Sequence, residues 1–165
     1  MKTNDLTVLR EKLYQIANLV HKDIPIVLKV EGIKFIQKNF QDEGFNDGGL
    51  EKWKPRKTTD RQGRDITRYR TNRVGKKGNL NRYGSKIKGR AILTGHASGG
   101  NKLRHSFKTR IAKNKVTFYT HKEYASRHNE GLDGMPKRQF IGKSRTLDEN
   151  IKKEIDRLFQ QLTKK

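Results

Sequence analysis

The sequence contains no cysteine, and this absence excludes disulfide bonds and zinc sites that depend on thiolate ligands. Acidic residues are also few, with 17 Asp and Glu against 39 Lys and Arg, and only 31% of the residues are hydrophobic. No apolar run is long enough to cross a membrane, and the N-terminal residues lack the hydrophobic core of a signal peptide. We therefore expect a soluble, non-exported protein with a modest core and no membrane contact.

Positive charge is what the sequence has in excess. The formal net charge is +22 over 165 residues. Such a charge favours a polyanionic partner or an acidic protein surface, in an association that weakens as salt is added. The length fits a single domain, residues 1–165.

Residues 1–45 form the predicted helical region. Aliphatic residues recur at helical spacing in its first part and would line one face: Leu6, Leu9, Leu13, Ile16, Ala17 and Val20. Asp23 followed by Pro25 indicates a break, in which Asp23 caps a second helix over about residues 24–41. The expected core residues of that second helix are Leu28, Ile33, Ile36 and Phe40.

Residues 46–90 are predicted to form a long, mobile, basic loop. Between Lys52 and Arg90, fifteen Lys and Arg residues stand against only Asp60 and Asp65. Such a stretch buries too little apolar surface to offset the entropy of ordering it. Its cations are candidates for contact with a polyanion: Arg61, Arg64, Arg68, Arg70, Arg73, Lys76, Lys77 and Arg82. The alternative is a solvated loop that orders only against a neighbouring subunit.

Residues 91–144 hold the predicted β-hairpin core. Residues 102–112 alternate loosely, and residues 116–120 are rich in β-branched and aromatic side chains. Thr146 and Glu149 fit a capping box at the start of a C-terminal helix over residues 146–163. This order of elements predicts an α+β fold, in which a small antiparallel β-sheet packs against the N-terminal helices and the C-terminal helix.

A phosphate-binding motif fails on its spacing, and the common catalytic motifs are absent from the sequence. The stretch from Gly95 to Lys102 differs from a phosphate-binding P-loop, because Asn101 separates the last glycine from the lysine. No serine lies in a nucleophile elbow, and no paired carboxylates stand ready for acid–base work. We therefore expect no catalytic residues, no cofactor and no enzymatic activity.

A metal-dependent nuclease is a third-ranked reading. His121 and His128, with Glu123 or Glu130, are residue types that ligate metals. The ββα-metal pattern that such a nuclease needs is not visible around them, and polar histidines at strand ends and loops are the simpler interpretation. We therefore expect no metal site.

Five short pieces follow one another in a recognisable order. They are Phe40 with Asp47-Gly48-Gly49 and Trp53-Lys54-Pro55; Leu93-Thr94-Gly95; Leu103-Arg104-His105-Ser106; Tyr124-Ala125 with His128 and Gly131; and Pro136, Arg138, Phe140 and Gly142. In this order they resemble the phage virion morphogenesis family of tail completion proteins, of the Mu-like prophage type. The resemblance spans about Leu6 to Leu162, and it departs from the family where His96 to Lys102 intervene and where the basic loop is long.

The resemblance implies a structural role without catalysis, in which subunits complete the tail or join it to the head during virion assembly. Related neck and tail-end proteins form rings, often of six subunits, around the DNA channel. For this chain it implies a homo-oligomeric ring at the neck or tail end of the virion, assembled in the cytoplasm of the bacterial host. Other tail or neck proteins would be its partners, and its basic loop would be free to contact DNA non-specifically.

The motif residues have two readings, as anchors of the core and turns or as parts of an interface. These candidate interface or motif residues are Trp53, Leu103, Arg104, Tyr124, His128, Pro136, Arg138 and Phe140. The alternative function, from a different class, is a basic nucleic-acid-binding module that uses residues 52–90 as its arm.

Overall fold

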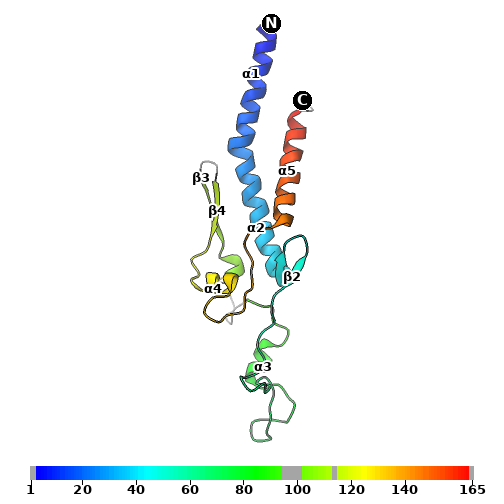
Figure 1. Ribbon diagram of the computed structural model, residues 1–165, viewed down its shortest axis with the longest axis vertical. Helices are drawn as coiled ribbons and strands as arrows, with labels where there is room; N and C mark the ends of the chain where they lie inside the picture. Colours follow the sequence, from blue (N-terminus) through cyan, green and yellow to red (C-terminus); the bar gives the residue numbers. More distant parts are fainter. Residues whose placement is uncertain (1–2, 94–101, 113–114, 164–165) are drawn as a thin grey trace.

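The computed structural model describes residues 3–93, 102–112 and 115–163 of the chain. Helices are combined with two antiparallel sheets of two strands each, so the predicted α+β class is confirmed. Figure 1 shows an elongated molecule with both termini at one end and residues 56–90 at the other. None of the helices in the described ranges is both long enough and apolar enough to span a membrane.

One continuous helical rod forms the N-terminal part. It consists of α1 (Thr3–Asn18), a π-helical turn (Leu19–Asp23) and α2 (Ile24–Asp42), and at about 1.5 Å per residue it is about 60 Å long. The predicted break and cap at Asp23 are wrong. This residue has helical φ and ψ angles of −81° and −44°, and its side chain makes no capping hydrogen bond.

The π-helical turn explains how the rod passes its proline. Pro25 has no N–H to donate, and its ring crowds the carbonyl of His21, four residues earlier. The turn just before it is wider than an α-helical turn, and the Ile24 N–H donates to the Leu19 carbonyl five residues back. Such an insertion lets a helix continue past a residue that would otherwise kink or end it.

The two halves of the rod differ in burial. The C-terminal half of α2 packs against α5 (Arg145–Thr163) and the core, and it buries Phe35, Ile36 and Phe40. From Asp5 to Ala17, in contrast, every side chain of α1 is exposed. The apolar face predicted for this segment exists, but nothing in the described part of the chain covers it.

The core lies at the foot of α2. It brings together buried side chains from distant parts of the chain: Ile36, Phe40, Trp53, Leu103, Ala125 and Phe140. Phe40 is at its centre, with ring centroids 5.2 Å from Phe140 and 5.4 Å from Trp53. Offset and edge-on aromatic pairs of this kind stabilise a fold beyond the area that they bury.

A small hairpin follows α2 and holds the start of α5. Its strands, β1 (Gly44–Asn46) and β2 (Leu50–Lys52), are antiparallel, with Phe45 opposite Glu51. The turn between them contacts the N-terminus of α5. Asp47 Oδ1 accepts from the Arg145 N–H at 2.7 Å.

The predicted capping box at Thr146 and Glu149 is wrong, because Ser144 caps α5. The Ser144 hydroxyl accepts from the Leu147 N–H at 3.2 Å and donates to the Asn46 carbonyl at 2.6 Å. Thr146 instead accepts from the Gly48 N–H at 2.9 Å. The cap is therefore shared with the β1–β2 turn, which sequence spacing alone does not reveal.

The second hairpin confirms the predicted one, with different bounds. Its strands are β3 (Lys108–Ala112) and β4 (Lys115–Tyr119), with Thr109 opposite Phe118. The hairpin packs on α2 at Gly32, where a side chain would overlap the Phe118 ring. Its expected first strand is shorter than residues 102–112, because Leu103–His105 form a 3-10 turn.

The sequence did not predict the short helix α4 (Tyr124–Glu130), which ends at Gly131 with a left-handed φ of 78°. Residues 135–141, which follow α4, form no strand. The glycine-rich stretch from Thr94 to Asn101 and residues 113–114 lie outside the described residues, as do the last two residues of the Leu93-Thr94-Gly95 motif.

The long unstructured basic loop is not confirmed. Residues 56–90 contain α3 (Arg82–Ile87) and two isolated antiparallel bridges, Thr59 with Asp65 and Arg68 with Leu80. This stretch has few apolar residues, and hydrogen bonds from backbone N–H groups to side-chain oxygens order it instead. Asp60 Oδ1 accepts from two backbone N–H groups, and Asn81 caps α3 by accepting from the Gly84 N–H at 2.8 Å. We call residues 56–90 the basic lobe.

Candidate functional site

The candidate site is built around Arg138, whose side chain is only 6% exposed. Its Nε donates to the Lys54 carbonyl at 3.0 Å, and its Nη2 donates to the Pro55 carbonyl at 3.1 Å. Its backbone N–H donates to the carbonyl of His128 at 2.7 Å. Arg138 therefore joins α4 to the segment that enters the basic lobe.

The Arg138 charge is buried without a counter-charge in the described part of the chain, where only carbonyl oxygens accept its hydrogen bonds. Burial lowers the pKa of the guanidinium, and the like charge of Arg56 lowers it further. A buried cation without an anionic partner is costly, because carbonyl dipoles only partly replace its hydration.

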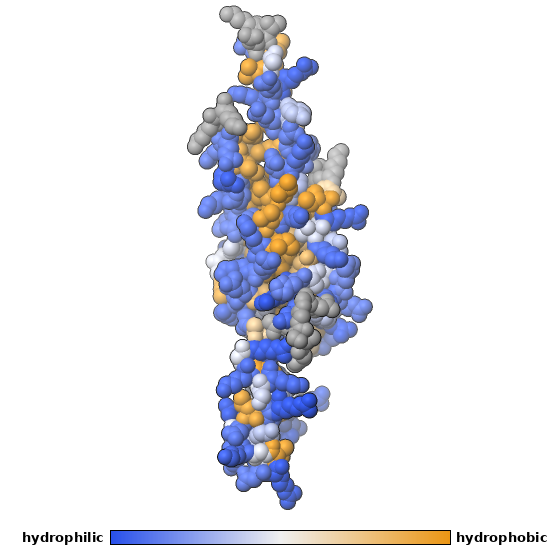
Figure 2. Space-filling model, turned by 180° about the vertical axis from the view of Figure 1, so that it is seen from behind, coloured by the Kyte–Doolittle hydropathy of each residue, from blue (hydrophilic) through white to orange (hydrophobic). Residues whose placement is uncertain are grey.

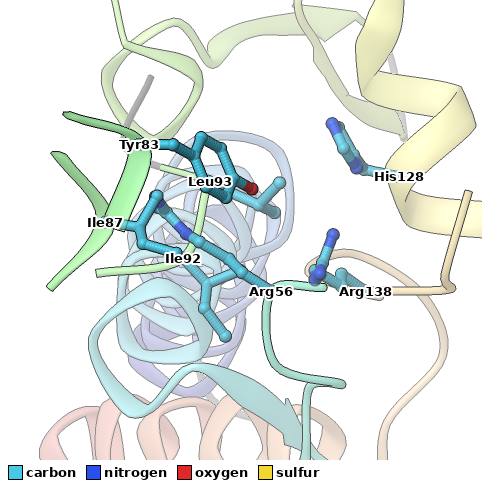
Figure 3. Close-up of a pocket in the computed structure, with 7 residues that line it drawn as sticks. All are labelled: Arg56, Tyr83, Ile87, Ile92, Leu93, His128 and Arg138. Carbon is cyan, nitrogen blue, oxygen red and sulfur yellow. The ribbon is translucent and has the colours of Figure 1, made fainter. Parts of the chain in front are cut away.

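A pocket of about 200 Å³ opens beside this guanidinium, where the basic lobe meets α4 (Figure 3). Its lining residues are Arg56, Tyr83, Ile87, Ile92, Leu93, His128 and Arg138. Figure 3 shows His128 and Arg138 together on one side and the apolar residues with Tyr83 on the other. No carboxylate belongs to the lining within the described chain, so the pocket is positively charged.

Arg56 contributes the second charge. Its Nη2 donates to the Ala91 carbonyl. Neither its Nε nor its Nη1 makes a hydrogen bond to a described residue. The Arg138 Nη1 also makes no hydrogen bond to a described residue. The pocket therefore retains N–H donors that the described part of the chain does not bind.

His128 adds a polar atom without a partner. Its Nδ1 is buried and forms no hydrogen bond with any described residue. Its ring meets Tyr124 edge-on, with centroids 6.1 Å apart. Burial lowers the pKa of His128, and the Arg138 charge adds to that effect, so the imidazole is neutral at pH 7 and can accept or donate one hydrogen bond at each nitrogen.

The structure divides the eight candidate motif residues into three groups. Trp53, Leu103 and Phe140 are buried in the core, where the Trp53 indole N–H donates to the Gln139 carbonyl at 2.7 Å. His128 and Arg138 line the pocket, with Pro136 half-buried in the same segment. The remaining two, Arg104 and Tyr124, are exposed.

All eight candidate polyanion-binding residues are exposed side chains of the basic lobe: Arg61, Arg64, Arg68, Arg70, Arg73, Lys76, Lys77 and Arg82. Some of them also hold the lobe together. Arg64 pairs with Asp60 at 2.6 Å, and Arg70 donates to the Asp65 carbonyl. Hydrogen bonds from Thr67 and the nearby arginine charges lower the pKa of Asp65, which is therefore ionised at neutral pH.

Sequence reasoning did not single out three of the pocket residues: Arg56, Ile87 and Ile92. Arg56 is one of many cations in its stretch, and only its place directly after the Trp53-Lys54-Pro55 motif distinguishes it. His121, Glu123 and Glu130 are exposed, and no three His, Asp or Glu side chains gather as a possible metal site within residues 3–93, 102–112 and 115–163.

Comparison of this chain with protein-family models, with curated proteins and with solved structures finds no match. The candidate site therefore depends on its own geometry and chemistry.

Proposed function

We propose that the protein is a structural subunit for phage tail completion or head–tail joining, which acts without catalysis as a homo-oligomeric ring. The observation that carries the proposal is the uncovered apolar stripe of α1, which we define as Leu6, Leu9, Leu13 and Ile16. These side chains are 53%, 47%, 58% and 43% exposed. Figure 2 shows hydrophobic residues in a band along the helical part, bordered by hydrophilic ones.

The energetics of the stripe favour association. Full burial of a fully exposed aliphatic side chain contributes about 1.5–3 kcal/mol. These four are about half exposed, so covering each of them contributes roughly half of that and offsets part of the cost of joining two proteins. We assign the stripe to a second copy of the chain, because a ring joins two different surfaces of one subunit. α5 offers a complementary surface in Phe159, which is 39% exposed.

The resemblance to tail completion proteins supplies the biological setting. Four of its five pieces contribute buried side chains to one core, although they are far apart in the chain: Trp53, Leu103, Ala125 and Phe140. Two pieces meet in the hydrogen bond between the Arg138 N–H and the His128 carbonyl. Motifs that pack together in one core support a fold shared with the family that the chain resembles. The ring and the position in the virion are inferred from this resemblance.

Replacement of the stripe residues by aspartate is expected to abolish the oligomer. Light scattering after size exclusion should give a multimer for the wild type and a monomer for Leu9→Asp/Leu13→Asp, because each carboxylate would have to be desolvated in the contact. Gln15→Asp, which adds the same residue to the other side of α1, is the matched control and should stay multimeric. A wild-type chain that is monomeric at every concentration and salt would contradict the ring.

The effect of salt on association distinguishes this function from the second candidate. The net charge of +22 makes copies repel one another, so added salt should strengthen the oligomer. Binding to DNA should weaken with salt, because phosphate contacts release counterions. Co-purification with neck or tail particles in a phage-producing host would test the virion role directly.

The second candidate function is non-specific DNA binding through the basic lobe, favoured by the exposure of all eight of its candidate cations. Lys76→Gln/Lys77→Gln should weaken binding to duplex DNA and lower the salt slope by about 0.9 for each phosphate that the variant no longer neutralises. Lys152→Gln/Lys153→Gln, on exposed positions of α5, removes the same charge elsewhere. Equal decreases of affinity in fluorescence anisotropy for the two variants would mean that the lobe has no special role.

A further inference from the structure

We propose that the pocket between Arg56 and Arg138 binds the carboxylate of an aspartate or glutamate side chain that a protein partner inserts. The proposal rests on the proposed function only in naming an assembly partner as the source of this side chain. The pocket itself is part of the single chain, so its binding chemistry can be tested without assembly.

The first argument is the number of unused donors. Arg138 donates from Nε and Nη2 to the carbonyls of Lys54 and Pro55. These two bonds fix the plane of its guanidinium and leave Nη1 without a described partner. Arg56 is held at Nη2 by the Ala91 carbonyl, and its Nε and Nη1 make no hydrogen bond to a described residue. Both guanidinium groups are therefore anchored before a ligand arrives, which lowers the entropy that binding costs.

The second argument is the charge that the pocket encloses. Two arginine side chains line one cavity, and no carboxylate in the described chain lies in its wall. An anion between them would relieve both the repulsion and the unpaired burial of Arg138. The Nδ1 of His128, buried without a partner among the described residues, is a further group that can donate to an anion once the ring carries a proton there.

The third argument is the shape and lining, which favour a carboxylate over a DNA phosphate. The cavity of about 200 Å³ has an apolar wall of Ile87, Ile92 and Leu93. Such a wall packs well against the methylene groups of a glutamate stem. A phosphodiester carries a sugar on each side, so it reaches exposed cations such as those of the basic lobe more readily than a recessed pocket.

The probe for the experiment is N-acetyl-glutamate N-methylamide, added to the wild-type chain and followed by NMR. The signals to observe are the Arg138 Nε–H and the His128 ring protons. Their shifts should saturate, and the dissociation constant should be about tenfold lower than for N-acetyl-glutamine N-methylamide or for dimethyl phosphate. A charge-assisted hydrogen bond contributes enough to account for such a ratio.

Variants assign the binding to the pocket. Arg56→Gln should weaken binding of the glutamate probe by about tenfold, whereas Arg61→Gln, which removes an exposed charge of the same lobe, should change it by less than about twofold. Trp53 fluorescence checks that each variant is folded. If Arg56→Gln does not fold, Arg56→Lys keeps the charge but not the planar fork, and it should weaken binding by about threefold.

Three outcomes of these measurements would overturn the proposal. Tighter binding of dimethyl phosphate would assign the pocket to a nucleic-acid backbone. Equal effects of Arg56→Gln and Arg61→Gln, or shifts without saturation, would show only the general attraction of a basic protein for anions. A monomeric chain whose pocket still selects the glutamate probe would leave the pocket standing and reject the ring alone.

Discussion

Phe140→Ala is expected to lower the free energy of unfolding by about 3–5 kcal/mol, which is the usual cost of truncating a fully buried phenylalanine. Phe140 is 1% exposed and contacts Phe40 and Phe107, with ring centroids at 5.2 and 5.4 Å. Its backbone N–H also donates to Asn129 Oδ1 at 3.0 Å. Its ring neighbours, Phe40 and Phe107, are rigid aromatic side chains, so they can fill little of the cavity.

Urea unfolding followed by the fluorescence of the single tryptophan measures this destabilisation, since Trp53 is buried in the same core. A change of this size is a large part of the total stability of an ordinary domain, so the variant should be partly unfolded at 37 °C. The matched control is Phe159→Ala on α5, at a protein concentration low enough to prevent association, and it should cost less than about 1 kcal/mol. Equal destabilisation by the two variants would show that the core is not centred on Phe140.

The parts of the fold that sequence predicts correctly depend on local patterns. The apolar periodicity of α1 and α2, the β-branched and aromatic run of β4 and the apolar face of α5 each signal their element within a few turns. The sequence did not predict the π-helical turn before Pro25 or the Ser144 cap, because at each place two local structures are close in energy. A proline can begin a helix or be bypassed inside one, and Ser144 and Thr146 are both able to cap.

The parts that sequence misses depend on side chains that meet across long separations. Arg138 bonds to the Lys54 carbonyl 84 residues away, and no periodicity signals such a contact. The basic lobe was predicted to be a mobile loop because it contains few apolar residues, and composition offers no other source of order. Its order comes instead from side-chain caps such as Asp60 and Asn81, which composition treats as ordinary polar residues.

Asn39 is the other position at which one change should have a large effect. It is completely buried at 0% exposure and connects three elements. Its Oδ1 accepts from the Asn46 N–H at 3.1 Å and from the Asn46 side-chain amide at 2.8 Å. Its Nδ2 donates to the Phe140 carbonyl at 3.2 Å. At neutral pH the amide offers both the acceptor and the donor that this arrangement needs, whereas an ionised carboxylate only accepts.

Asn39→Asp is therefore expected to cost about 3 kcal/mol or more at pH 7, because a buried carboxylate would face the Phe140 carbonyl. Burial raises the pKa of this new acid in the folded state above its unfolded value. The protonated acid can donate to the Phe140 carbonyl, so the folded state binds the proton more tightly than the unfolded state. The stability of the variant relative to the wild type should then rise as the pH falls through the raised pKa.

Urea midpoints at pH 7, 5.5 and 4.5 test this sign, with Asn39→Ala as the control that cannot titrate. The wild type itself is expected to lose stability as the pH falls through the unfolded pKa of His128, because burial lowers the folded pKa of this group and the unfolded state takes up the proton first. That decrease is common to all three proteins and cancels in the differences. Asn39→Ala should stay about 2–4 kcal/mol below the wild type at every pH, whereas Asn39→Asp should approach the wild type in acid. A deficit of Asn39→Asp that is independent of pH would mean that position 39 is hydrated and that its amide does not connect α2 to β1 and Phe140.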